Sequence, residues 1–347
     1  MKFGITLVEL AEELQRRENR KRDFIADTRL ISFSDLGQAQ LQLNINEENF
    51  SLTSHCHRQL SQFLDIPAKY YDRMISQAPG LAVETINTWL NYTPRRRLIR
   101  TLDGKARAWL SDRYQRIDNY DLTHAILPLI SELSPDARVE SCQLSETKLY
   151  LKVVNPKLTD EVKPGDYVQS GFILSNSEVG AGSVQVQPLI YRLVCKNGLI
   201  VNEASFSRYH LGNRMGKESL AYELVSEQTR SLELETLLSQ VKDTIKAVTD
   251  PSKFNLIIQQ LQQASNRPLN GKPADIIEVT AQKGALNEPE QQNVLTHLIE
   301  GGDLSQWGLV NAITRTSQDV DSYERATELE RFGGEVLTMN PKVLVSV

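Results

Sequence analysis

The spacing of apolar residues predicts one helix and then short strands in the first 45 residues. Over residues 6–22 the apolar positions recur every three or four residues, and Thr6 with Glu9 makes a capping-box pattern. Apolar and polar residues then alternate over 29–33 and 40–45, which is typical of strands with one buried face. We therefore expect an amphipathic helix followed by strands.

Helical spacing returns from residue 54 to about residue 90, and proline divides it into short pieces. Pro67 can open a second helix, and Pro79-Gly80 separates a third. Three short helices are expected here, between the early strands and the next strand signal.

A hairpin is predicted immediately afterwards. Asp103-Gly104 lies between LIRTL and KARAWL, and this dipeptide is a strong two-residue turn signal. With that turn, Arg100 would lie opposite Arg107, and Trp109 would share their face of the strand pair.

The middle of the chain suits further antiparallel strands, and the last third suits helices. Strands are expected over 138–154, 166–174 and 184–196, with Asn197-Gly198 as another hairpin turn that pairs Cys195 with Ile200 and Arg192 with Glu203. Beyond Glu218 nearly every segment has helical periodicity.

The predicted hairpin carries the strongest positive charge in an acidic chain. Residues 94–116 hold eight basic and two acidic residues, a net charge of +6, whereas the whole chain carries −5. Positive charge confined to one segment is typical of an anion site. The candidate phosphate contacts are Arg95, Arg96, Arg97, Arg100, Lys105, Arg107 and Arg113, and the candidate base-stacking residues are Trp109 and Tyr114.

Two explanations are open for the arginine pair. Like charges directly opposite each other on paired strands repel, so something must offset Arg100 and Arg107. A carboxylate from elsewhere in the fold would make the pair structural, whereas a phosphate backbone would make it a binding surface.

A further basic cluster lies in SFSRYHLGNRMGKE. It comprises Arg208, Arg214 and Lys217, beside Tyr209 and two glycines. Such a segment can bind an anion, and it can equally be a linker to the helical region.

Other chemistry has weak support in the sequence. His55-Cys56-His57 has no second cluster with ligand spacing, so we expect no metal. No nucleophile motif and no paired carboxylates accompany Glu178, which favours a protein without catalytic residues or cofactor. Three widely spaced cysteines, no long apolar run and no signal-peptide layout favour a cytoplasmic protein that does not enter a membrane.

Several stretches of the chain resemble a known family. These are SGFILSNSEVGAGS, YRLVCKNGLIV, RAWLSDRY at 107–114, WGLVNAITR at 307–315 and RATELERFGG at 325–334. Over roughly residues 50–335 the chain resembles a phage- and plasmid-associated family known only as domain of unknown function family 932. The resemblance implies a cytoplasmic protein of phages, plasmids or bacterial chromosomes and brings no agreed catalytic residues.

Together these patterns predict an α+β fold: a mostly antiparallel curved sheet with flanking helices, followed by a helical C-terminal part. The expected division is 1–217, with the basic hairpin, and 218–347, an acidic helical region with 11 basic and 19 acidic residues. The leading hypothesis is a protein of mobile-element DNA recombination that binds single-stranded DNA as a homo-oligomer, similar in its properties to annealing proteins. The alternative is a non-enzymatic self-assembly protein whose basic segment docks on an acidic protein surface.

Overall fold

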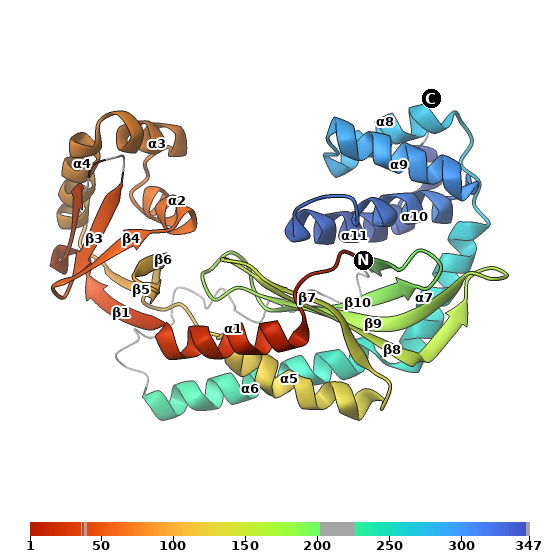
Figure 1. Cartoon of the computed structure of the whole chain (residues 1–347), viewed down its shortest axis with the longest axis horizontal. Coiled ribbons are helices and arrows are strands. Elements are labelled where there is room, and N and C mark those ends of the chain that lie inside the picture. The colour runs from red at the N-terminus through yellow and green to blue at the C-terminus, as the bar shows by residue number, and fades with distance from the viewer. Residues whose placement is uncertain (36, 38–39, 202–225, 345–347) are drawn as a thin grey trace.

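Two sheet-based parts lie side by side in the structure (Figure 1). The computed structural model describes residues 1–35, 37, 40–201 and 226–344. The fold is α+β with a helical C-terminal region, as predicted, but its strands form two sheets. The predicted boundary between residues 217 and 218 lies outside the described residues.

The first sheet must curl because its two edge strands are neighbours in sequence. Its order is β1-β5-β6-β4-β3-β2, and only the short helix η1 (Thr28–Leu30) separates β1 from β2. All its pairs are antiparallel except β4 with β6. The strands are β1 (Arg22–Asp27), β2 (Ile31–Asp35), β3 (Leu41–Ile45), β4 (Glu48–Leu52), β5 (Arg96–Leu102) and β6 (Lys105–Ser111).

Three short helices enclose the core of the curled sheet, as the proline pattern predicts. They are α2 (Ser54–Phe63), α3 (Ala68–Gln77) and α4 (Pro79–Tyr92). The buried side of α4 carries Ala82, Ile86 and Leu90, which belong to the same apolar cluster as strand residues such as Phe33. The Asn87 side chain accepts from the backbone N–H of Phe33 (2.8 Å) and donates to its carbonyl (3.0 Å), so α4 also satisfies the edge of β2.

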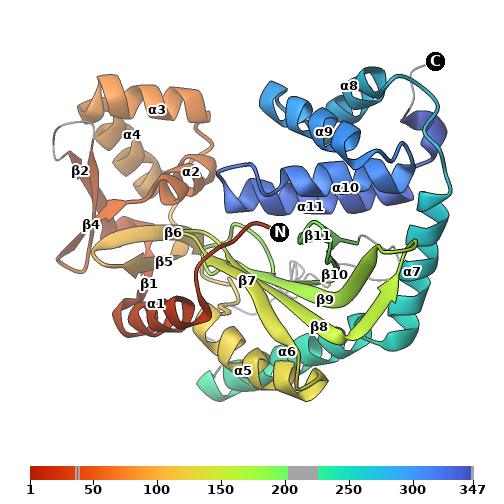
Figure 2. The ribbon, with the colours of Figure 1, turned by 45° about the vertical axis from the view of Figure 1, so that its right-hand side comes forward.

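The second sheet is an antiparallel meander with helices on both faces (Figure 2). Its strands are β7 (Arg138–Leu144), β8 (Leu149–Glu161), β9 (Tyr167–Asn176), β10 (Gln185–Arg192) and β11 (Asn197–Ile200). One face packs on α5 (Asn119–Leu133) and α6 (Glu227–Val248). The other packs on α7 (Pro251–Ser265), α10 (Gln306–Thr316) and α11 (Tyr323–Thr338), and α8 (Pro273–Gly284) and α9 (Glu288–Gly301) complete this helical layer.

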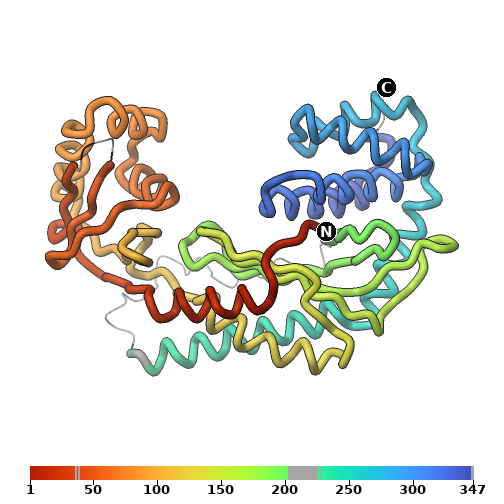
Figure 3. Tube along the Cα trace, in the orientation of Figure 1, coloured from red at the N-terminus to blue at the C-terminus, as the bar shows by residue number. Residues whose placement is uncertain are grey.

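Within the described residues the chain passes between the two parts twice, as the Cα trace in Figure 3 shows. Helix α1 (Leu7–Arg20) leads from an isolated bridge between Ile5 and Cys142 to β1, and residues 112–118 lead back from β6 to α5. The predicted capping box of Thr6 and Glu9 is present at the start of α1. These two connections and the loop after β9 place the basic hairpin against the second sheet.

The predicted Asn197-Gly198 turn is wrong. The turn comprises the four residues 193–196, before the predicted dipeptide, with Lys196 at a φ of 52°, and residues 197–200 form β11. Ile200 pairs with Leu189 and not with Cys195, while the expected partner Glu203 lies outside the described residues. A tertiary contact holds the start of β11 in this position: the buried Asn197 amide donates to the Thr314 hydroxyl on α10 (2.5 Å).

An ion pair missed by the sequence reading is enclosed between the second sheet and α11. Lys152 of β8 and Glu330 are both fully buried, with Nζ and Oε2 2.6 Å apart. The ammonium group also lies over the Tyr323 ring, 4.6 Å from its centroid. Burial lowers the pKa of Lys152, although the charge of Glu330 acts in the opposite direction.

None of the helices in the described ranges is long and apolar enough to cross a bilayer.

Candidate functional site

The hairpin forms at the predicted turn, but a bulge changes its register. Thr101 pairs with Ala106 and Leu102 with Lys105, as the Asp103-Gly104 turn requires. Beyond these pairs the register shifts, so Arg100 lies opposite Ala108 and Arg107 is the extra residue. The predicted direct opposition of Arg100 and Arg107 is therefore wrong.

Arg100 is completely buried and bound by two carboxylates. Its neighbour across β1 is Asp23, which accepts from its Nε at 2.9 Å, and Asp118 accepts from its Nη2 at 2.6 Å. Its Nη1 donates to the backbone carbonyl of Glu178 at 3.0 Å. Burial alone would lower the pKa of the Arg100 guanidinium, but the negative charges of Asp118 and Asp23 have the larger combined effect and raise it.

Asp118 holds two cations at the start of α5. Besides Arg100 it accepts a hydrogen bond from the Lys21 ammonium at the end of α1. Burial alone would raise the pKa of Asp118, but the charges of Arg100 and Lys21 bring it below its usual value. This carboxylate thus joins α1, β5 and α5 in one polar contact.

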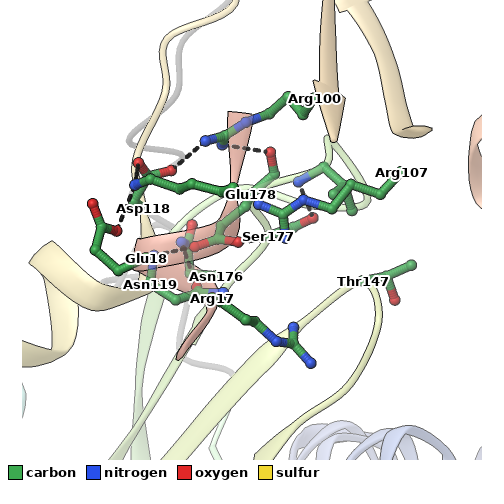
Figure 4. Close-up of polar contacts among 12 residues, drawn as sticks. Arg17, Glu18, Arg100, Arg107, Asp118, Asn119, Thr147, Asn176, Ser177 and Glu178 are labelled. Atoms are coloured by element: carbon green, nitrogen blue, oxygen red, sulfur yellow. Dashed lines mark hydrogen bonds and ion pairs between the residues drawn. The ribbon is translucent and has the colours of Figure 1, made fainter. Parts of the chain in front are cut away.

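Arg107 is also internal, and its partner is Glu178 in the loop after β9. The Arg107 Nη1 donates to Glu178 Oε2 at 2.7 Å, and the other oxygen accepts from the Asn119 backbone N–H at 2.7 Å. Figure 4 shows both arginines directed toward this loop. Asn176 fixes the beginning of the loop by donating to Asn119 Oδ1 and to the Ile117 carbonyl.

The bulge also explains why Trp109 does not share the face of the arginines. Its ring lies on the helical side of the curled sheet, with centroids 6.2 Å from Phe33 and 5.8 Å from Phe63. It is only 3% exposed. Arg100, Arg107 and Trp109 are therefore corrected from surface contacts to internal residues. Of the two explanations for the arginine pair, the internal carboxylates are the right one.

Tyr114 and Lys105 also differ from the predicted contact surface. The Tyr114 hydroxyl donates to the Ser177 carbonyl at 3.0 Å, and burial raises its pKa. Lys105 is exposed, but it lies at the turn end of the hairpin beside Asp103, which is paired with Arg16 and Arg20 of α1. The predicted residues are thus not brought together on one surface.

The remaining predicted arginines gather at the opposite end of the hairpin, where β5 begins and β6 ends. We call Arg95, Arg96, Arg97 and Arg113 the open-end arginines. Arg95 and Arg113 are exposed, and Arg96 and Arg97 are half-buried. Two hydrogen bonds hold this end of β5 against η1: the Thr28 N–H donates to the Arg95 carbonyl, and the Arg95 N–H donates to the Thr28 hydroxyl.

Arg97 differs from the internal arginines because it has no carboxylate partner among the described residues. Its guanidinium lies over the Phe63 ring, 3.8 Å from the centroid, and its buried Nε has no hydrogen-bond acceptor in that part of the chain. Burial lowers the pKa of Arg97 to about 10, and the charge of Arg95 adds to this effect, against Asp112. A cation in this condition is stabilised by any anion that approaches it.

A second polar site, a cavity of about 220 Å³, lies between α9, α10 and the β10–β11 turn. Its cations already have partners: Arg192 pairs with Asp166, Lys163 with Asp303 and Arg315 with Asp319. Because these charges are compensated, the cavity is a weaker anion site than the open end.

The described residues contain no geometry that supports a metal site at His55 and His57. There, no group of three or more His, Cys, Asp or Glu side chains could hold an ion. His55 Nε2 is 2.9 Å from the Val179 carbonyl, and His57 Nδ1 is 2.9 Å from the Tyr71 hydroxyl. The further basic cluster of Arg208, Arg214 and Lys217 lies outside the described residues.

The sequence reading missed the carboxylates that neutralise the hairpin. Asp23, Asp118 and Glu178 come from β1, the residue before α5 and the loop after β9. The sequence signal for Glu178 is the segment SNSEVG, which places a carboxylate in a predicted loop without indicating which cation it meets.

The fold and its polar junction thus define an α+β protein in which a basic hairpin is held internally and exposes arginines at one end. Comparison with protein families matches residues 108–331, more than half of the chain, to the family described as a domain of unknown function, DUF932. The chain belongs to this family. Comparisons with curated proteins and with solved structures give no significant match.

Proposed function

We propose that the open-end arginines bind the phosphate backbone of single-stranded DNA. The supporting observation is Arg97, a half-buried guanidinium whose burial lowers its pKa to about 10 and which has no carboxylate partner within the described chain. Arg95 and Arg113 are exposed beside it, and neither has an ion pair with a described residue. A phosphate placed here would compensate charge that the fold leaves uncompensated.

The arrangement favours a polymer over a small anion. The open-end arginines lie at an exposed strand end and do not line the 220 Å³ cavity near α10. Contacts spread over a surface suit a chain of phosphates, and such binding depends steeply on salt. No metal or cofactor is needed for this activity.

A salt titration of oligonucleotide binding tests the proposal. Fluorescence anisotropy with a labelled oligo(dT) should show binding at low salt. A plot of the logarithm of the binding constant against the logarithm of the salt concentration should have a slope of about −2, from about 0.7 for each of the phosphates that Arg95, Arg97 and Arg113 would neutralise. Arg97→Met should weaken binding and reduce the slope by about 0.7. The unbranched methionine can still lie over Phe63, so folding should be preserved.

Lys283→Ala provides the matched control. Lys283 is exposed on α8, in the helical layer of the other part, and its removal changes the net charge by the same amount. It should leave the slope unchanged. Absence of binding at low salt, or equal losses in the Arg97 and Lys283 variants, would contradict the proposal.

Self-assembly through the same arginines is the second proposal, supported by the charge difference between the two portions of the chain. Residues 218–347 carry 11 basic and 19 acidic residues, so an acidic surface of another copy could accept the open end. Light scattering across salt concentrations separates the two. Salt-sensitive association that oligo(dT) does not alter would favour self-assembly.

A further inference from the structure

Two large aromatic side chains are exposed at the end of α4, next to the open-end arginines. Trp89 is 45% exposed and Tyr92 is 75% exposed, while the other side of the helix is buried. Their ring centroids are 5.6 Å apart and their planes are almost perpendicular, at 85°. Aromatic rings are costly to leave in water, so an exposed pair is informative about binding.

Backbone contacts keep this pair beside the arginines. The Thr28 hydroxyl in η1 donates to the Leu90 carbonyl (2.8 Å) and accepts from the Arg95 backbone N–H (3.1 Å). The Thr28 backbone N–H donates to the Arg95 carbonyl (3.0 Å). The end of α4, η1 and the start of β5 are therefore tied together. Only two residues lie between Tyr92 and Arg95, so their Cα atoms, three steps apart along the chain, are at most about 11 Å apart.

We propose that Trp89 and Tyr92 stack on unpaired bases and make the open end selective for single strands over duplex. The inference rests on the proposed function, because the arginines supply the phosphate contacts beside which the bases would lie. Every base has a flat face, but in a duplex these faces are already stacked on neighbouring bases. Exposed rings next to arginines can therefore bind single strands without reading their sequence.

The charge around the pair decides between nucleic acid and a protein partner. The open end combines the aromatic pair with Arg95 and Arg113, which are exposed, and with Arg97, which lacks a carboxylate partner among the described residues. Leu30, 70% exposed, is the one large aliphatic side chain on η1. An aromatic pair beside uncompensated cations complements bases and phosphates better than it complements an apolar protein surface.

The three tryptophans allow a direct optical test. Trp109 and Trp307 are 3% and 1% exposed, so a ligand that quenches native fluorescence by stacking acts on Trp89. Unlabelled oligo(dT) should quench the wild-type protein, and the quench should disappear in Trp89→Phe while binding persists. An equal quench in Trp89→Phe would overturn the assignment of Trp89.

Affinity measurements test Tyr92. Tyr92→Ala should weaken oligo(dT) binding by about 5-fold or more, the lower limit for one stacked base, with an unchanged salt slope. Tyr92→Phe should restore the affinity, and binding of a blunt hairpin duplex should be the same in all three proteins. Arg97→Met should instead weaken the binding of both oligo(dT) and the duplex, and it should reduce the salt dependence of binding.

These outcomes separate the inference from the proposed function. If the wild-type protein binds oligo(dT) and duplex equally, or if Tyr92→Ala binds oligo(dT) as the wild type does, stacking is refuted and the arginine site stands. If the wild-type protein binds neither at low salt, both proposals are refuted. A Tyr92→Ala variant that changes only self-association would identify the pair as a protein contact and overturn the inference.

Discussion

Glu178→Gln tests whether the hairpin arginines are structural. The substitution keeps the shape of the side chain and an oxygen that can accept from the Asn119 N–H, but it removes the charge opposite Arg107. The side chains of Arg107 and Glu178 are only 4% and 7% exposed. Moreover, Nε and Nη2 of Arg107 have no acceptor within the described residues, so Glu178 carries nearly all of the compensation.

The expected magnitude follows from this burial. Breaking a buried ion pair by removing one partner costs about 3–5 kcal/mol, because the other charge is left in the interior. We expect Glu178→Gln to lower the free energy of unfolding by about that amount, and the melting temperature by roughly 5–15 °C. The double variant Arg107→Met with Glu178→Gln should recover most of the loss, since no buried charge remains.

The free energies of unfolding for this double-mutant cycle can be measured by urea unfolding, with tryptophan fluorescence as the signal, and the melting temperatures by calorimetry. Glu48→Gln is the control, because Glu48 and its partner Arg22 form an exposed ion pair on the same sheet and should contribute little. The reasoning is refuted if Glu178→Gln unfolds like the wild type, or if the losses of the single variants simply add. A folded Arg107→Met protein with weakened oligonucleotide binding would instead return Arg107 to the binding surface.

Three further outcomes are expected. Glu330→Gln should destabilise the protein by about 3–5 kcal/mol and Lys152→Met with Glu330→Gln should recover much of this, as measured by urea unfolding, because both side chains are fully buried. Gly334→Ala should lower the melting temperature or prevent folding, because a Cβ at this position would lie 2.0 Å from the Ile200 carbonyl oxygen, and circular dichroism will show it. The pKa of Asp118 lies below its usual value in the folded state, so its stabilising effect is present above about pH 4 and is lost as the pH falls through the lowered pKa. Stability measured from pH 6 to pH 2 should therefore fall less steeply in Asp118→Asn than in the wild type.

Local features of the chain follow from the sequence because their causes are local. The capping box at Thr6, the proline-separated helices and the Asp103-Gly104 turn each depend on residues within a few positions. The net charge of +6 over residues 94–116 is likewise a property of the sequence. These observations sufficed to predict the α+β class and the position of the hairpin.

Which way the hairpin side chains point was decided by tertiary structure. Turn chemistry sets only the first pairs of a hairpin, and the bulge at Arg107 appears where that arginine and Arg100 both reach the loop after β9. Whether an arginine is buried depends on distant carboxylates: Asp23 is 77 residues from Arg100, and Glu178 is 71 residues from Arg107. Partners that are this far apart along the chain cannot be recognised from a local sequence pattern.

The same reason divides the basic stretch in two. From the sequence, Arg97 and Arg107 are equivalent, since both are strand arginines in one charged segment. In the folded chain Arg107 meets Glu178, whereas Arg97 meets the Phe63 ring and no carboxylate of the described residues. The sequence by itself determined that this segment carries excess charge, and only the packing of the two sheets decided where that charge is neutralised, because a buried ion pair requires a partner brought from a distant part of the chain.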